Sequence, residues 1–231
     1  MKEQCIDFVD FHTHILPSVD HGSDSIDTSL KQLKLAKSFG ITKIFATSHF
    51  YPHQHTVSSF IKKRNEAYKM IKDSGVTVPE IKLGAEVLLC EGLHKLEGLE
   101  NLCFTGTNIL LLELPFTNLT EGTLHTVRRL VYNGFDVILA HADRYPYARI
   151  EALLECDVKI QLNADSLASI FASKKLFDWL ERGLVVGIGS DIHGADRKAY
   201  KKFAKAIYKI GSYAEDVKLK SEEIFKKALQ L

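Results

Sequence analysis

The sequence predicts an α/β barrel that forms a single domain over residues 1–231. Short apolar runs of strand length recur along the whole chain, and longer segments with helical periodicity, or loops, separate them. We find no internal repeat or proline-rich linker, and a length of 231 residues suits one such barrel. We therefore expect a parallel sheet of about seven βα units around one core.

The strands of this sheet are expected in seven apolar runs. They cover residues 6–11, 41–47, 81–87, 109–114, 136–140, 158–162 and 185–189. Short runs of this apolar content are typical of buried strands in a parallel sheet.

Helices are expected between the strands, where they would cover the barrel. The first, over residues 25–39, has apolar residues at helical spacing from Ile26 to Ala36 and stops at Gly40, a residue type that commonly caps helix ends. Similar patterns predict helices over residues 57–74, 121–132, 147–155, 167–182 and 197–210, and a final lysine-rich helix over 221–231.

The composition excludes some classes of partner. The formal net charge is +1, so no chain-wide charge favours nucleic acid or an anionic membrane surface. Without a signal peptide or an apolar run of about 18 residues, we expect a cytoplasmic protein with no membrane insertion. The four cysteines, Cys5, Cys90, Cys103 and Cys156, are widely spaced, and we expect reduced thiols in or near the core. The oligomeric state is left open.

Residues of metal-ligand type lie at the ends of six of the seven predicted strands or shortly after them. They are His12 and His14, His49, Glu86, Glu113, His141, and Asp191 with His193. Because all strands of an α/β barrel point their carboxyl ends at the same face, we expect these distant residues to converge on one pocket.

The residue types indicate which ions would bind there. Imidazoles and carboxylates without a thiolate suit zinc, manganese or iron. About nine candidates exceed the three to five ligands of one ion and indicate two or three divalent metals. In His12-Thr13-His14, side chains two residues apart lie on one face of a strand, although this spacing alone is common in ordinary histidines. The alternative, a set of satisfied core residues, is disfavoured because burying so many ionisable groups without a cation is costly.

The segments that carry these residues resemble a known family. They are residues 10–17 (DFHTHILP) with Asp20 and Gly22, then 46–49 (ATSH), 84–86 (GAE), 112–116 (LELPF), 140–145 (AHADRY) and 189–193 (GSDIH). Together they resemble the polymerase and histidinol phosphatase (PHP) superfamily, and within it the bacterial tyrosine phosphatases of capsule and exopolysaccharide synthesis. The resemblance runs essentially end to end. It implies a distorted TIM-like barrel with three metal ions, of which manganese is favoured.

The resemblance also implies a role for each candidate residue. His12, His14, Glu86 and Asp191 would hold a first metal, Glu86 would bridge to a second with Glu113 and His141, and Asp20, His49 and His193 would hold a third. Family members usually have two aspartates before the glycine where this chain has Asp20-His21-Gly22. His21 is therefore an alternative ligand to Asp20. Family members also carry a phosphate-contacting arginine at the position of Arg144, and another near Arg197.

Such a site suggests a mechanism. Clustered divalent ions lower the pKa of a bridging water, which provides a hydroxide nucleophile near neutral pH, and they offset the charge on a phosphoryl group. The planar forks of Arg144 and Arg197 suit phosphate oxygens. No cysteine lies in the CxxxxxR loop of thiol-based tyrosine phosphatases, which favours the metal route. The general acid is left open between a metal-bound water and Asp143.

Aromatic side chains after the strand ends are candidates for a rim around a substrate ring. They are Phe50, Tyr51, Phe116 and Tyr145, each of which has ordinary packing as the alternative role.

The function implied by the resemblance is dephosphorylation of phosphotyrosine on a protein, with a bacterial tyrosine autokinase and its tyrosine-rich tail as the partner. A small-molecule phosphatase, such as a histidinol phosphate phosphatase with the same metals, is the first alternative. A non-catalytic metal-stabilised docking module is the second, and the near-complete ligand set argues against it. Nucleic acid is not expected as a partner, because the lysines of residues 198–209 and 218–227 are explained as solvated faces of outer helices.

Overall fold

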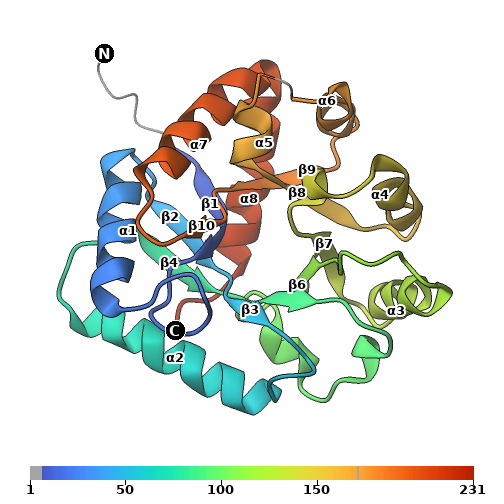
Figure 1. The fold of residues 1–231 in the computed structure, drawn as a ribbon, viewed down its shortest axis with the longest axis horizontal. Coiled ribbons are helices and arrows are strands. Elements are labelled where there is room, and N and C mark those ends of the chain that lie inside the picture. Colours follow the sequence, from blue (N-terminus) through green and yellow to red (C-terminus); the bar gives the residue numbers. More distant parts are fainter. Residues whose placement is uncertain (1–6, 171) are drawn as a thin grey trace.

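The computed structural model of the chain describes residues 7–170 and 172–231 and confirms the parallel α/β architecture (Figure 1). Its strands are β1 (Val9–His14), β2 (Lys43–Ala46), β3 (His49–Phe50), β4 (Glu80–Leu83), β5 (Glu86–Leu88), β6 (Ile109–Glu113), β7 (Asp136–Leu139), β8 (Lys159–Asn163), β9 (Val185–Gly189) and β10 (Ile192–His193). Every described strand pair is parallel. The carboxyl ends of the strands therefore lie on one face.

The sheet is curled, and two of its strands are interrupted. The hydrogen-bonded order is β3-β5-β6-β7-β8-β9-β1-β2-β4, with β10 beside β1. In the chain, β3 closely follows β2, and β5 closely follows β4. Each of these two pairs of short strands can be seen as one longer, interrupted strand. The two longer strands lie side by side, because β2 pairs with β4 and β3 pairs with β5. The second interruption falls at Gly84, where a side chain would meet Phe104 at 2.5 Å.

The interior of the barrel is filled by aromatic and aliphatic side chains. Phe11, Phe45 and Phe104 pack together, with centroid distances of 5.2 Å between Phe11 and Phe45 and 4.1 Å between Phe45 and Phe104. Phe225 packs on Phe45 at 5.0 Å and closes the interior at the amino ends of the strands. This leaves the carboxyl ends for polar residues.

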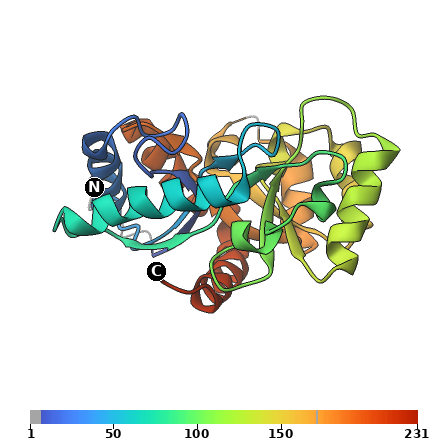
Figure 2. The same cartoon turned by 90° about the horizontal axis from the view of Figure 1, so that it is seen from below.

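Phe225 belongs to α8 (Ala214–Lys227), the last helix. The predicted range 221–231 is wrong at both ends, because the helix begins directly after a short turn and ends before the terminus. The buried ammonium of Lys82 donates to the backbone oxygen of Ala228 at 2.7 Å and ties the end of the helix to β4. In Figure 2, α7 (Arg197–Ile210) and α8 lie on opposite sides of the barrel.

The other helices lie outside the strands. They are α1 (Ile26–Ser38), α2 (Val57–Asp73), α3 (Glu121–Tyr132), α4 (Tyr147–Leu154), α5 (Ala164–Ala168) and α6 (Lys174–Glu181). Side chains cap several of them, because the first turn of a helix has unpaired N–H groups: Ser25, Thr56 and Thr120 each accept from the backbone N–H three residues on. No helix among the described residues combines the length and the apolar character needed to cross a bilayer.

The single helix predicted over residues 167–182 is wrong. The backbone becomes extended at Ser169, which ends α5, and the Ser173 hydroxyl caps the start of α6. Phe171, which falls within that prediction, lies outside the described residues. Cys5 and Ile6, the first residue of the predicted strand 6–11, also lie outside the described residues.

Candidate metal centre

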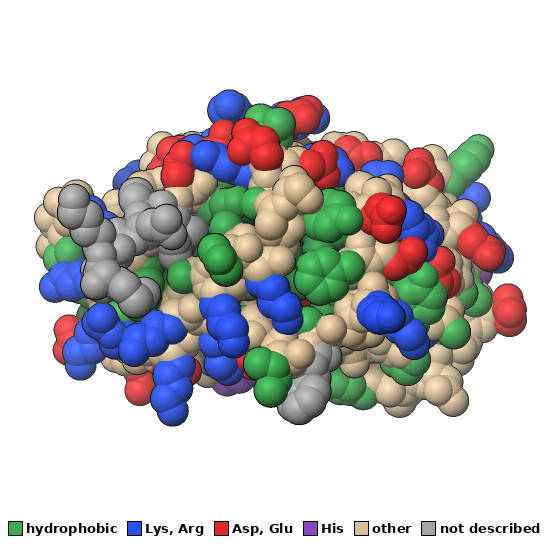
Figure 3. All heavy atoms as spheres, turned by 90° about the horizontal axis from the view of Figure 1, so that it is seen from above, with side chains coloured by type: hydrophobic (Ala, Val, Ile, Leu, Met, Phe, Trp, Pro, Cys, Tyr) green, Lys and Arg blue, Asp and Glu red, His purple; other side chains and the backbone are tan. Residues whose placement is uncertain are grey.

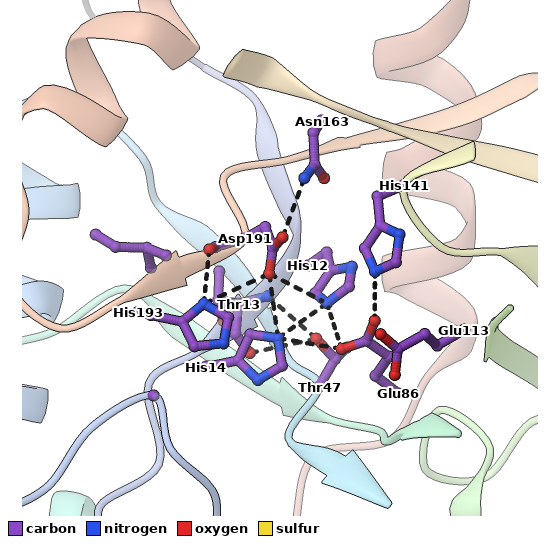
Figure 4. Close-up of polar contacts among 12 residues, drawn as sticks. His12, Thr13, His14, Thr47, Glu86, Glu113, His141, Asn163, Asp191 and His193 are labelled. Carbon is purple, nitrogen blue, oxygen red and sulfur yellow. Dashed lines mark hydrogen bonds and ion pairs between the residues drawn. The ribbon is translucent and has the colours of Figure 1, made fainter. Parts of the chain in front are cut away.

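Eight of the nine predicted ligands converge at the carboxyl face of the barrel (Figure 4). They form four overlapping groups: His12, Glu86 and His141; His12, His14 and Asp191; His49, Glu86 and Glu113; and His14, His49 and His193. Within each group the candidate ligand atoms all lie within 4.8 Å of one another. Such distances suit side chains that surround shared cations.

Glu86 is the carboxylate that two of these groups share. Its Oε1 lies 2.6 Å from His141 Nε2, and its Oε2 lies 3.1 Å from His12 Nε2 and 3.2 Å from His14 Nε2. Burial works against ionisation of this carboxyl, but the surrounding imidazoles outweigh burial and hold the pKa of Glu86 well below its usual value. The carboxylate is therefore charged and has several neighbours, as a bridging ligand requires.

His12 and His14 project from the end of β1 toward the same point. Their Nε2 atoms lie 3.0 Å apart, and Asp191 Oδ1 lies 3.8 Å from His12 and 3.3 Å from His14. The register between β1 and β2 shifts between Asp10 and Thr13, an irregularity of the kind that re-aims side chains beside active sites. Burial opposes protonation of both rings, but the nearby carboxylates outweigh it and raise both pKa values.

The Nδ1 atom of His49 has the environment of a ligand atom. It lies 3.0 Å from a Glu86 oxygen and 3.5 Å from a Glu113 oxygen. Within the described part of the chain it nevertheless makes no hydrogen bond, although it is buried. Burial disfavours its protonation, but the two glutamates outweigh burial and raise the pKa of His49 to about 9.

Two of the converging residues have an uncommon backbone conformation. His141 has a φ of 32° and Asp191 a φ of 49°, which lie in the left-handed region that residues with a Cβ seldom adopt. Both follow the end of a strand, and the backbone N–H of Asp191 donates to the oxygen of His12 at 2.9 Å. Strain of this kind is found at functional sites, where it aims a side chain at its target.

Asp20, the ninth predicted ligand, supports the cluster from behind. Its Oδ2 accepts from His14 Nδ1 at 2.7 Å and from the backbone N–H of His49 at 2.9 Å, and its Oδ1 accepts from the N–H of Gly22 at 2.9 Å. The contact with His14 Nδ1 leaves Nε2 of that ring free for the cluster. Asp20 as a metal ligand stays a prediction.

His21 lies between two of the candidate ligands. Its ring stacks on His49 with a centroid distance of 4.8 Å and on His193 with a distance of 4.7 Å. The alternative ligand that the sequence suggested is therefore within the group of histidines expected for the third metal.

Strand β8, which carries no predicted ligand, supplies residues that the sequence analysis missed. Gln161 Oε1 accepts from His12 Nδ1 at 3.1 Å and from the backbone N–H of His141 at 2.7 Å, while Asn163 Nδ2 donates to Asp191 Oδ2 at 3.0 Å. The signal that could have found them is the pair of amide side chains two positions apart in this strand. Their hydrogen bonds hold the side chains of candidate ligands in place.

Arg144 lies at the edge of the cluster and forms an ion pair with Asp191. Its side chain is 42% exposed, so it is accessible to a substrate. The turn that carries it is anchored by the buried carboxylate of Asp143, which accepts from the N–H of Asn163 at 2.7 Å and from the Ser166 hydroxyl at 2.6 Å. Arg197 starts α7, and its guanidinium lies over the Phe39 ring at 5.4 Å. Its predicted role toward phosphate stays a prediction.

Two of the four predicted rim aromatics lie beside candidate ligands, and a third lies beside one of these two aromatics. Tyr51 stacks on His49 at 5.1 Å, Tyr145 lies 5.8 Å from the His141 ring, and Phe116 lies 6.2 Å from Tyr145 with 81% of its surface exposed. The prediction is wrong for Phe50, which is fully buried in the core beside Phe60.

The chain is similar to proteins of known sequence. The family model for capsular polysaccharide synthesis, CpsB/CapC, matches residues 8–224. The chain is 27% identical over 210 residues to the putative tyrosine-protein phosphatase CapC of Staphylococcus aureus. This match covers 83% of this chain and 79% of that protein. It is also 27% identical over 211 residues to the tyrosine-protein phosphatase CpsB of Streptococcus pneumoniae. This match covers 82% of this chain and 84% of that protein.

The fold is shared with a solved structure as well. That structure comes from work on YwqE of Bacillus subtilis and CpsB of Streptococcus pneumoniae, described as unique metal-dependent tyrosine phosphatases. It superposes with a TM-score of 0.79 over 96% of each chain at 20% identity. This likeness confirms the predicted distorted TIM-like barrel.

Proposed function

The chain belongs to the CpsB/CapC family of capsular polysaccharide synthesis, and from that premise we propose that it is a metal-dependent phosphatase that removes phosphate from tyrosine side chains of proteins. The observation that carries the proposal is the convergence of eight imidazole and carboxylate side chains on one face of the barrel. The names of its relatives from Staphylococcus aureus and Streptococcus pneumoniae support the choice of phosphotyrosine. We treat residues 1–231 as one domain of this family.

The side chains of the cluster fit divalent metals. They offer nitrogen and oxygen without a thiolate, which suits manganese, iron or zinc, and we favour manganese. The buried His49 Nδ1, which has carboxylates beside it and no hydrogen bond in the described structure, supports a cation at this point. We assign His12, His14, Glu86 and Asp191 to a first ion, Glu86, Glu113 and His141 to a second, and His49 and His193 with Asp20 or His21 to a third.

Bound ions would lower the pKa of the attacking water and offset the charge of the phosphoryl oxygens. The reaction forms a bond from water oxygen to phosphorus and breaks the bond from phosphorus to the tyrosine oxygen. We assign to Arg144, which pairs with Asp191 at the edge of the cluster, the role of donating two hydrogen bonds to the phosphoryl group. Arg197 is a second candidate for this role.

The leaving group needs little help from the protein. A phenol has a pKa near ~10, so phenolate departs more easily than an alkoxide. Asp143, the acid that the sequence suggested, has both carboxylate oxygens occupied by hydrogen bonds to Asn163 and Ser166. We therefore give Asp143 the task of holding the Arg144 turn. We assign contact with the aromatic ring of the substrate to Tyr51, which stacks on His49, and to the exposed Phe116.

The proposed partner is a bacterial tyrosine autokinase with a phosphorylated, tyrosine-rich tail, and the proposed compartment is the cytoplasm. The family's link to capsular polysaccharide synthesis supports the partner. Three described cysteines, Cys90, Cys103 and Cys156, are free thiols, which suits a reducing compartment.

Turnover by the manganese-loaded protein tests the proposal. We expect a higher kcat/KM for a phosphotyrosine peptide than for histidinol phosphate, with phosphate release that depends on the metal. Faster cleavage of histidinol phosphate would establish the small-molecule phosphatase instead. A loaded protein that cleaves neither substrate, nor p-nitrophenyl phosphate, would favour the docking module.

A further inference from the structure

Helix α7, which begins close to the candidate metal centre, carries positive charges and no negative ones. The helix begins four residues after His193 and contains basic residues but no acidic one. The basic residues are Arg197, Lys198, Lys201, Lys202, Lys205 and Lys209. Lys198, Lys201, Lys202 and Lys205 are exposed, and we name these four side chains the basic ridge. Lys and Arg side chains gather along this part of the molecule in Figure 3.

This arrangement is unfavourable for the helix on its own. Lysines three or four positions apart, such as Lys198, Lys201 and Lys205, repel one another, and cations near the start of a helix oppose its dipole. Within the described structure, Lys202 is the member of the ridge with an ion pair, to Asp165 at 2.8 Å. A negatively charged partner would relieve the repulsion.

Helix α8 shows how the same chain arranges lysines on an ordinary outer helix. Lys220 pairs with Asp216 at 2.5 Å, and Lys227 pairs with Glu223 at 2.7 Å, each four positions away. A solvated face therefore explains the lysines of α8, as the sequence analysis expected. It does not explain the absence of acidic residues from α7.

One member of the basic ridge, Lys202, reaches a cavity beside the candidate metal centre. A cavity of about 170 Å³ is lined by Arg144, Asp191 and His193 on one side and by Lys202 of α7 on the other. Two acidic residues, Asp165 and Asp196, also line it. Asp196 is occupied as the cap of α7, since its side chain accepts from the N–H of Lys198 at 2.8 Å.

We propose that the basic ridge binds an acidic stretch of the substrate protein beside the phosphotyrosine that is hydrolysed, and that a second phosphotyrosine fits it best. The proposal rests on the proposed function. A phosphotyrosine carries a charge of about −1.5 to −2 near pH 7 and offers three acceptor oxygens, which complements a row of ammonium groups. The chemistry therefore selects a multiply phosphorylated protein segment.

The length of the helix limits where that second charge lies. The 14 residues of α7 span about 21 Å. An extended peptide covers this distance in about six residues. The second phosphotyrosine is therefore expected within about six positions of the first.

Steady-state kinetics on two peptides tests the ridge. One peptide carries two phosphotyrosines four positions apart, and the other carries a phosphotyrosine and an unmodified tyrosine at the same positions. The measured quantity is the ratio of kcat/KM for the first peptide to kcat/KM for the second, which cancels any general loss of active protein. The ridge variant is Lys201→Glu with Lys205→Glu. The control, Lys69→Glu with Lys226→Glu, makes the same charge change at exposed lysines of α2 and α8.

We expect the ratio to fall about tenfold in the ridge variant and in high salt, and to stay unchanged in the control. An unchanged ratio in the ridge variant, or an equal fall in the control, would refute the ridge. A third result would also refute the proposal: if the ridge variant lost binding to vesicles of anionic lipid while the ratio stayed the same, the ridge would bind a membrane surface. If the loaded wild-type protein hydrolysed neither peptide nor p-nitrophenyl phosphate, the proposed function itself would fail.

Discussion

The side-chain oxygen of Gln161 lies 3.1 Å from His12 Nδ1 and also accepts from the backbone N–H of His141 at 2.7 Å. An amide oxygen can only accept, so Nδ1 of His12 carries the proton and Nε2 faces the cluster. One residue of β8 thus sets the tautomer of a ligand on β1 and the position of a ligand after β7.

Replacing Gln161 should therefore weaken metal binding. We expect Gln161→Ala to raise the Kd for Mn²⁺ roughly ten- to hundredfold, because the loss of such a supporting contact typically has this effect. Titration calorimetry measures it. Gln54→Ala, which changes an exposed glutamine in a loop, is the control and should leave the Kd unchanged. A normal Kd for Gln161→Ala would show that the contact does not orient His12.

Removing Arg144 should separate metal binding from turnover. Arg144→Ala should keep its metal content and lose about a hundredfold or more in kcat/KM for phosphotyrosine peptides, because a charge-stabilising donor is lost. Arg144→Lys should recover only part of this, because an ammonium lacks the planar fork. Elemental analysis and kinetics measure the two properties, and loss of metal from Arg144→Ala would assign the residue to the metal site instead.

Metal affinity should rise with pH. In the metal-free protein the carboxylates raise the pKa of His49 to about 9, against an ordinary value of 6.5, so this ring holds a proton at pH 7 that a metal must displace. Mn²⁺ affinity should increase between pH 7 and 9, by up to about tenfold per pH unit for each proton displaced. Calorimetry in buffers with different ionisation enthalpies should detect released protons. A Mn²⁺ affinity that does not change between pH 7 and 9 would contradict the raised pKa of His49.

The same pKa makes a prediction about the stability of the metal-free protein. A pKa that is higher in the folded than in the unfolded state contributes stability below the unfolded value, and this contribution disappears as pH rises through the folded value. The contribution of His49 should therefore be lost between pH 6.5 and about 9. Urea unfolding of chelator-treated protein at several pH values measures it, with His49→Gln as the variant in which this part of the slope should be absent.

Variants at residues 20 and 21 should distinguish a supporting residue from a ligand. If His21 binds the third metal, His21→Ala should hold one metal fewer than the wild-type protein and keep the others tightly bound. Asp20→Ala should weaken metal binding at His14, whose ring it holds at 2.7 Å. Elemental analysis of both variants, with His53→Ala as the control at an exposed loop histidine, decides between them. Full metal content in His21→Ala would leave Asp20 as the ligand.

The site could be predicted from the sequence because parallel strands share a direction. Residues such as His12, Glu86 and His141 lie near the ends of apolar runs or directly after them, so their convergence could be expected from the barrel alone. Gln161 and Asn163 were missed because amides are not typical metal ligands, and their role depends on contacts with other strands. The break between α5 and α6 was missed because the apolar pattern continues across it, while backbone geometry at Ser169 decides it. Local pattern does not contain such tertiary contacts.

Phosphate release from a phosphotyrosine peptide during Mn²⁺ titration of the chelator-treated protein tests the central claim most directly. Activity should be absent at the start and reach its maximum at two or three bound metals per chain. Glu86→Gln should bind fewer ions and stay inactive, because four imidazole nitrogens lie within 3.2 Å of the Glu86 carboxylate. Full turnover by the stripped protein, or by Glu86→Gln, would contradict the account.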